Sequence, residues 1–173
     1  MDRLIDVFRR EGFEGASLAR LQDASGLKRS SLYHRFPEGK NDMARAVVAE
    51  VTNRFGTRIL AAAGTDSPLE DRITEIGQNL VGFYDDGQLP CLLDSMSIGQ
   101  PAEDVAELLD QATTAWINAL AGLSREAGHN RREAQIRATD AVVAIQGALV
   151  LARITGDRSA FERAITALPE RLL

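Results

Sequence analysis

Apolar side chains recur every three or four residues along nearly the whole chain, which is the spacing of α-helices that bury one face. Glycine and proline residues mark where one such segment ends and the next begins. These marks predict about nine helices and no strand, so the expected fold class is all-α. The first three helices are short and most later ones are long, which predicts a small N-terminal module on a larger helical body.

The small module shows clear helix boundaries. Its first helix is expected to end at Gly12. Ser17 can cap a second helix over 18–25, because a serine hydroxyl accepts a hydrogen bond from a free amide of the first turn. Gly26 is expected to close that helix in the left-handed conformation that glycine adopts readily. A third short helix is predicted over about 28–36.

The larger body is expected to consist mainly of long helices. Asp66 or Ser67 is the expected cap of the second of them, with Pro68 in its first position. The predicted helices cover about 40–63, 68–86, 90–99, 101–127 and 131–155, and a last helix follows Asp157.

One stretch of the body, AVVAIQGALVLARI at 141–154, is apolar nearly all round. Such a helix must be covered on two sides, and a second subunit is the economical cover. We therefore expect a homodimer in which two helices from each subunit form the contact. The residues expected at this interface are Gly147, Ala148, Leu149, Leu151, Ala152 and Phe161.

Composition points to an ordinary globular protein. The 173 residues are 45% hydrophobic and 26% charged, with a formal net charge of −5. Cys91 is the only cysteine, which excludes an internal disulfide and favours a cytoplasmic location. The sequence suggests neither a membrane span nor a signal peptide, so no membrane partner is expected.

Charge is distributed unevenly. Residues 1–50 hold nine Lys and Arg against eight Asp and Glu, a net of +1, whereas the other 123 residues hold eleven against seventeen, a net of −6. Residues 28–40 carry four cations and one acid. A basic patch on an acidic protein suits contact with a polyanion at one end. A chance fluctuation in surface charge is the alternative.

Residues 18–36 have the helix lengths of a helix-turn-helix, whose second helix enters the major groove of DNA. The first residues of that helix would face base edges, whereas later ones and the helix N-termini would reach phosphates. An ordinary solvated helix surface is the alternative. The residues expected to contact DNA are Ser17, Lys28, Arg29, Ser30, Ser31, Tyr33, His34 and Lys40.

The run SLARLQDASGLKRSSLYHRFPEGK, Ser17 to Lys40, resembles the DNA-binding signature of the tetracycline-repressor (TetR) family of bacterial transcriptional regulators. Three stretches of the body, CLL, AWINALAGLSREAG and QGALVLARITGD, are similar to the subgroup related to the lincomycin-resistance repressor. The resemblance implies a DNA-binding module at 1–40, to which a fourth helix connects, and a ligand-binding and dimerisation domain at 41–173. It also implies a homodimeric repressor whose partners are double-stranded operator DNA and a small, largely apolar ligand.

A ligand site would lie between helices of the body, where aromatic and flexible apolar groups line a cavity and an amide orients the ligand. Trp116 is the strongest candidate because its large indole carries an N–H that needs an acceptor. Plain hydrophobic core is the alternative for each candidate. The candidates are Phe55, Phe83, Tyr84, Met96, Trp116 and Gln146.

An enzyme would need a catalytic constellation, and the sequence offers none. The two histidines, His34 and His129, are far apart, and Cys91 has no base near it in sequence. Neither metal-ligand spacing nor a glycine-rich phosphate loop is present. We expect no catalytic residue, no metal and no cofactor. A helical small-molecule-binding or adaptor protein without DNA binding is the remaining alternative.

Overall fold

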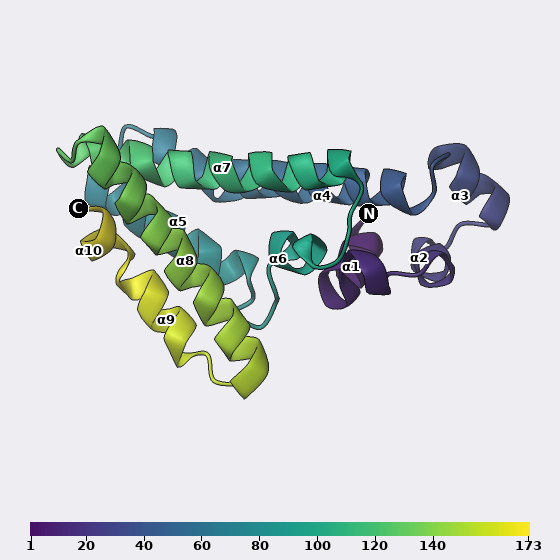
Figure 1. Cartoon of the computed structure of the whole chain (residues 1–173). Helices are drawn as coiled ribbons and strands as arrows, with labels where there is room; N and C mark the ends of the chain where they lie inside the picture. The colour runs from purple at the N-terminus through teal and green to yellow at the C-terminus, as the bar shows by residue number, and fades with distance from the viewer. The chain divides into compact units, whose positions relative to one another are not determined.

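The computed structural model describes all 173 residues except for the side chain of Arg29. Its described part contains ten α-helices and one 3-10 helix and no strand, which confirms the all-α prediction (Figure 1). The elements are α1 (Asp2–Gly15), α2 (Leu18–Ser25), α3 (Arg29–Arg35), α4 (Lys40–Arg58), the 3-10 helix η1 (Leu60–Gly64), α5 (Leu69–Phe83), α6 (Leu92–Ser97), α7 (Glu103–Glu126), α8 (Arg131–Thr155), α9 (Ser159–Thr166) and α10 (Leu168–Leu172).

The chain forms two compact units. The first unit contains residues 1–53 and 91–112, and the second contains residues 54–90 and 113–173. Helices α4 and α7 each contribute residues to both units. The functional division at residue 40 stays a prediction.

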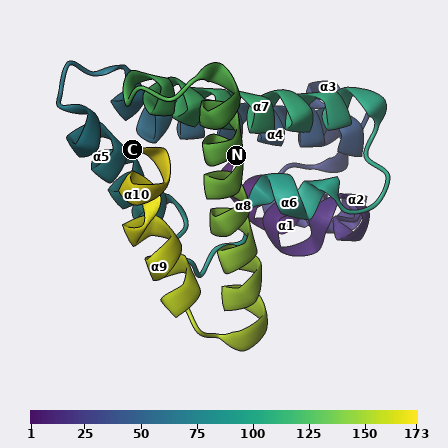
Figure 2. The same ribbon diagram turned by 60° about the vertical axis from the view of Figure 1, so that its left-hand side comes forward.

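The first unit is built around the three short N-terminal helices and α6. Phe8, Leu21 and Leu32 are its buried anchors, one from each short helix. Helix α1 breaks at Gly12, where φ is 67° and ψ is −174°, and then continues for three more residues. A Cβ atom at Gly12 would lie 2.7 Å from the Ser95 carbonyl oxygen of α6. Glycine therefore allows α1 and α6 to approach closely, and both views draw these helices side by side (Figures 1 and 2).

The predicted boundaries of α2 are confirmed. The Ser17 hydroxyl accepts a hydrogen bond from the Arg20 backbone N–H at 3.3 Å. Gly26 closes the helix in the left-handed conformation, with φ at 67°. Local capping chemistry was sufficient to locate both ends of this helix.

The second unit is organised around α8, which packs against α9 and α10. Asn130 and Glu133 form a capping box at the start of α8, and Gly156 ends the helix with φ at 72°. Asp157 then accepts hydrogen bonds from the backbone N–H and hydroxyl of Ser159, and these bonds lower the pKa of the Asp157 carboxyl. Helices α8 and α9 consequently form a tight hairpin (Figure 2).

Three boundary predictions differ from the structure. The expected caps Asp66 and Ser67 are wrong, because Pro68 occupies the N-cap position of α5 without a side-chain cap. The helix expected over 40–63 ends as α4 at Arg58 and tightens into η1. The single last helix is two, α9 and α10, since Pro169 lacks an N–H and enforces a new helical start.

The expectation of no membrane-length segment also needs correction. Helix α8 is long and apolar enough to cross a membrane by length and composition alone, with 39% of its apolar window buried inside the chain. A core helix of a globular protein meets the same criterion. Most of this apolar window is therefore not buried by the chain itself.

Candidate nucleic-acid interface

Helix α3 is anchored by two apolar residues and presents its other described side chains to solvent. Leu32 is 2% exposed, and Phe36, directly after the helix, is 6% exposed. Both pack into the core of the first unit. The expected DNA contacts with exposed side chains on α3 are Ser30, Ser31, Tyr33 and His34. The side chain of Arg29, the expected base reader, lies outside the described part of the chain.

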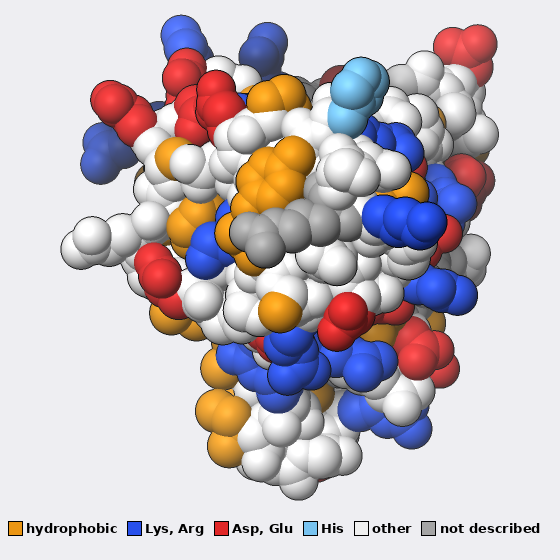
Figure 3. Space-filling view, turned by 90° about the vertical axis from the view of Figure 1, so that its right-hand side faces the viewer, with side chains coloured by type: hydrophobic (Ala, Val, Ile, Leu, Met, Phe, Trp, Pro, Cys, Tyr) orange, Lys and Arg blue, Asp and Glu red, His pale blue; other side chains and the backbone are white. Residues whose placement is uncertain are grey.

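Tyr33 lies beside the corner that joins α3 to α4. A Cβ atom at Gly39 would lie 3.9 Å from Tyr33 Cε1 and 3.6 Å from Leu18 Cδ2, so the ring and the start of α2 flank the same turn. Tyr33 is 39% exposed and Leu18 is 40% exposed. Figure 3 faces the side on which Figure 1 draws α2 and α3, and shows hydrophobic groups with Lys and Arg side chains around them.

Two further expected contacts lie at helix N-termini. Ser17 is exposed at the N-cap of α2, and Lys28 is exposed at the N-cap of α3. Free amides at such positions favour a phosphate group. Arg20, in the first turn of α2, is not a free cation, because its Nε lies 2.9 Å from Glu11 Oε1.

Lys40 is engaged inside the first unit. Its ammonium donates a hydrogen bond to the Phe13 carbonyl oxygen at 3.0 Å and lies 4.4 Å from the centroid of the Phe13 ring. The side chain thus ties α4 to the end of α1. Its expected phosphate contact stays a prediction, for which the ammonium has two further N–H donors.

The beginning of α4 carries an ionic cluster that sequence reasoning missed. Asp42 Oδ2 accepts a hydrogen bond from the Glu38 backbone N–H at 2.6 Å. The Arg45 guanidinium binds the carboxylates of Asp42, Glu38 and Asp104. Hydrogen bonds from the Glu38 backbone N–H and from Arg45 lower the pKa of Asp42, and a hydrogen bond from Arg45 lowers that of Asp104. The same contacts raise the pKa of Arg45.

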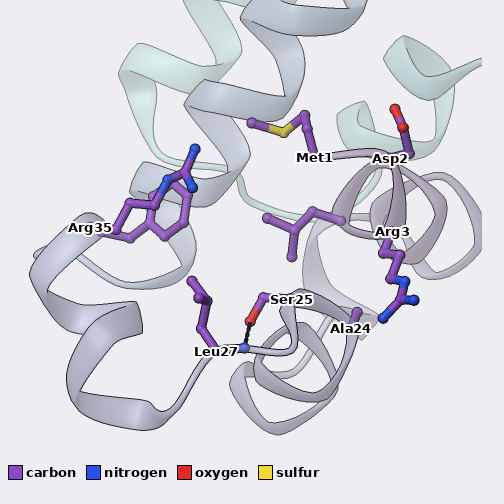
Figure 4. Close-up of a pocket in the computed structure, with 9 residues that line it drawn as sticks. Met1, Asp2, Arg3, Ala24, Ser25, Leu27 and Arg35 are labelled. Atoms are coloured by element: carbon purple, nitrogen blue, oxygen red, sulfur yellow. Dashed lines mark hydrogen bonds between the residues drawn. The ribbon is translucent and has the colours of Figure 1, made fainter.

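A pocket of about 350 Å³ opens between the start of α1, the turn before α3 and the end of α3. Figure 4 shows Met1 and Arg3 on one side of it and Leu27 and Arg35 on the other. The Arg35 guanidinium lies 5.6 Å from the centroid of the Phe36 ring. Arg35 is exposed and follows His34 directly. Its position in the sequence could therefore have identified it as a further candidate for DNA contact.

In the second unit, four of the predicted ligand residues form one aromatic cluster. The ring centroids of Phe55 and Trp116 lie 5.0 Å apart, those of Phe55 and Phe83 5.3 Å, and those of Phe83 and Tyr84 5.2 Å. Trp116 is 1% exposed, and its indole N–H has no acceptor within the described part of the chain. Of the other two candidates, Met96 is buried in the first unit and Gln146 is half-buried in α8.

The structure shows where the residues of the expected dimer-interface set lie. Four of its six members are buried by the chain's own helices, namely Ala148, Leu149, Ala152 and Phe161. Phe161 packs instead against Tyr84, with ring centroids 6.2 Å apart. Gly147 and Leu151 are exposed. The uncovered apolar face of α8 contains Gly147 and Leu151 of the predicted set, whereas the other predicted residues of α8 lie on the side that the chain itself buries.

Metal-binding chemistry was also sought in the described residues, where no group of three or more His, Cys, Asp and Glu side chains is arranged to hold an ion. Cys91 is buried and not part of a disulfide. The groups gathered around α3 are hydroxyls, cations and rings. These are groups that can donate hydrogen bonds to a polyanion or stack against it.

Two family descriptions match the chain. Residues 1–47 match "Bacterial regulatory proteins, tetR family", and residues 85–167 match "Transcriptional regulator LmrA/YxaF-like, C-terminal domain". None of the curated proteins matches this chain.

Several solved structures share the fold. A TetR transcriptional regulator from Legionella pneumophila superposes with a TM-score of 0.84 at 19% identity, over 97% of this chain and 94% of that one. A TetR-family regulator from Agrobacterium tumefaciens gives 0.83 at 18% identity, over 98% and 95%. A cysteine mutant of the TetR-family regulator CifR, complexed with 26-bp double-strand operator DNA, gives 0.77 at 24% identity, over 99% and 92%.

Proposed function

The chain belongs to the TetR family of bacterial transcriptional regulators, with an LmrA/YxaF-like C-terminal domain, and from that premise we propose that it is a ligand-responsive repressor acting as a homodimer. DNA binding and transcriptional regulation come with the family. Repression, the response to a small molecule, the dimer, the cytoplasmic location and the absence of enzymatic activity are the proposed parts.

One observation supports the DNA-binding role most directly. Helix α3 is seven residues long, and Leu32 is the only one of its described side chains that is buried. A helix this short gains little stability from its own hydrogen bonds, and serves best as a rigid platform for the polar groups on its surface. We propose that Ser31 and Arg29 read base edges and that Tyr33 and His34 contact the sugar-phosphate backbone.

A direct experiment is selection of duplexes from a random-sequence library by the purified protein, followed by fluorescence anisotropy. Arg29→Ala should lower affinity by about 1–3 kcal/mol at one base position and relax preference there. Tyr33→Phe should instead weaken binding to every duplex evenly. A uniform loss for Arg29→Ala would contradict its assignment as a base reader. Repression would appear as lower expression from a reporter preceded by the selected duplex.

The homodimer is proposed from the face of α8 that no part of the second unit covers. Its exposed apolar residues are Ile136, Val143, Leu151 and Ile154, and Ile154 is 72% exposed. They follow the helical repeat on one side of α8, together with exposed Asp140 and Gly147. Apart from the adjoining part of α8 itself, no atom lies within 4 Å of the position where a Gly147 Cβ would stand, which leaves space for a neighbouring backbone.

A second copy of the chain fits this face because the face is self-complementary. Counted from Ile145, Ile136 and Ile154 lie nine residues away on either side, and Val143 and Gly147 lie two residues away. A two-fold axis near this point would place Ile136 of one copy beside Ile154 of the other. A groove of about 390 Å³ at the start of the stripe is lined by Ile136 and by charges of both signs, from Glu133, Arg137, Asp140 and Arg171.

Cysteine cross-linking tests this arrangement. In a Cys91→Ser background, Gly147→Cys should form a disulfide-linked dimer under mild oxidation, because it lies near the proposed axis. Gln78→Cys, on an exposed position of α5, is the matched control and should stay monomeric on a non-reducing gel. A monomer for both variants would refute the proposed axis.

The ligand site is proposed at the aromatic cluster around Trp116. A buried N–H without an acceptor costs free energy that a bound acceptor group would recover. Trp116 is also the only tryptophan, so a compound bound beside it should change the intrinsic fluorescence of the protein. Titration of small apolar compounds that carry an acceptor group tests this. A compound that changes the fluorescence but leaves the DNA affinity unaltered would contradict the proposed response to a ligand.

A further inference from the structure

The corner between α3 and α4 is short and closely tied to α4. Helix α3 ends at Arg35 and α4 begins at Lys40. Within the corner, the Gly39 N–H donates to the Phe36 carbonyl oxygen at 2.9 Å, and the Glu38 N–H donates to Asp42 at 2.6 Å. The recognition helix therefore follows the first turns of α4, and whatever holds those turns also orients α3.

Two cations hold the start of α4 to other helices of the first unit. Lys40 reaches the Phe13 carbonyl oxygen on α1. Arg45 binds Asp104, in the first turn of α7, and it also binds Glu38 in the corner and Asp42 in α4. Asp104 Oδ1 additionally accepts the Val105 N–H at 2.9 Å, which fixes the carboxylate at the helix start.

We propose that Arg45 is a positioning residue for DNA binding: its bridge to Asp104 holds the α3–α4 corner in the orientation that presents α3 to the major groove. Arg45 acts through the corner and contacts no base itself. The inference rests on the DNA-binding role of α3.

The chemistry of the side chain explains why an arginine occupies this position. A guanidinium carries five N–H donors in a planar fork, so it can satisfy three carboxylates at once. The Arg45 side chain is 28% exposed, and its partners Asp42 and Asp104 are 21% and 47% exposed. A single exposed ion pair contributes little to stability, but a cation shared among one acid of the corner, one of α4 and one of α7 restricts geometry more strongly.

The test compares Asp104→Asn with Asp110→Asn, which removes the same charge from an exposed position further along α7. Each protein is titrated into a fluorescent duplex that the wild type selected from a random library, and into a scrambled duplex of equal length. If the wild type selects no duplex, DNA binding itself fails, and that result is distinguishable from failure of the positioning role.

The direction of the change in DNA affinity distinguishes a positioning role from a simple effect of charge. Loss of an acidic charge by itself strengthens binding to any polyanion. If Arg45 positions α3 through Asp104, the loss of Asp104 should weaken binding to the selected duplex. Asp104→Asn should therefore bind that duplex about five-fold more weakly than Asp110→Asn does. The two variants should bind the scrambled duplex equally. Equal affinity of both variants for the selected duplex would overturn the proposal.

Arg45→Lys provides the second variant if Asp104→Asn melts at a lower temperature than its control. Lysine keeps the charge but cannot span three carboxylates in one plane. The expected result is again about a five-fold loss for the selected duplex and no loss for the scrambled one. Wild-type affinity for the selected duplex in Arg45→Lys would overturn the proposal.

Discussion

The two compact units are built alike inside but expose different helix surfaces. In the first unit, Lys40 binds the Phe13 carbonyl oxygen and Arg45 binds Asp104, beside an apolar core. In the second unit, Arg72 binds Glu126 and the Arg137 guanidinium donates to the Arg171 carbonyl oxygen at 2.9 Å, beside a core that contains the aromatic cluster and the buried side of α8. The difference lies in the exposed surfaces of α3 and α8.

This difference shows what each surface can bind. The exposed groups described on α3 are hydroxyls, a phenol, an imidazole and the Arg35 guanidinium, which can exchange water for phosphate or base edges. Helix α8 instead exposes a stripe of aliphatic side chains, which gain free energy when another apolar surface removes them from water. A polar surface on one unit and an apolar surface on the other therefore call for two kinds of partner, nucleic acid and protein.

The largest effect is expected on the apolar surface of the second unit. Val143→Glu places a charge at the centre of the proposed dimer contact, and an unpaired buried charge costs about 3–5 kcal/mol. Sedimentation equilibrium should show a dimer dissociation constant raised at least about 100-fold. Gln78→Glu is the control, since it adds the same charge to an exposed position of α5. A persistent Val143→Glu dimer would show that α8 faces something other than a second copy.

A smaller effect is expected on the stability of the first unit, where α1 packs against α6. Gly12→Ala introduces a Cβ atom 2.7 Å from the Ser95 carbonyl oxygen at a φ of 67°, and should lower the free energy of unfolding by about 3 kcal/mol. Gly26→Ala has the same φ and open space around it, so it should cost about 1 kcal/mol. Urea denaturation of both variants measures the difference. Equal losses would mean that α1 and α6 do not pack closely.

The next prediction separates polar groups that join helices from polar groups that meet DNA. Lys28→Ala should reduce the salt dependence of DNA binding by about one phosphate contact, because Lys28 is exposed at the start of α3. Lys40→Ala should lower the melting temperature and leave that dependence unchanged, because its ammonium is bound to Phe13. Affinity measured at several salt concentrations compares the two. A salt dependence that Lys40→Ala also reduces would show that Lys40 contacts a phosphate, as the sequence predicts.

The smallest effect concerns pH. Folded-state pKa values of Asp42 and Asp104 lie below the ordinary 3.8, so their contribution to stability is complete above that value and is lost as the pH falls below it. Arg45 stays charged throughout. Melting temperatures between pH 7 and pH 3 should fall less steeply at the acid end for Asp104→Asn than for the wild type. Identical acid slopes would mean that the cluster does not stabilise the first unit.

Much of the DNA-binding region could be predicted from sequence because its determinants are local. Ser17 and Gly26 mark the two ends of α2, through hydrogen bonds and backbone preferences that span three or four residues. The exposed residues of α3 lie within two helical turns on either side of buried Leu32, so the helical repeat is sufficient to place them on the surface. The spacing of Glu38, Asp42 and Arg45 also carried a local signal, which was present in the sequence and was not used.

The sequence by itself determined the helices, most of their ends, and the helix-turn-helix segment that we propose contacts DNA, because all of these depend on neighbours within a few residues. Only the tertiary structure decided which side of α8 is covered, that Lys40 turns toward Phe13, and that Asp104 reaches Arg45 across 59 positions of the chain. The physical reason is packing. A helical pattern shows that a face is apolar or charged, but the partner of that face is chosen by how the helices come together.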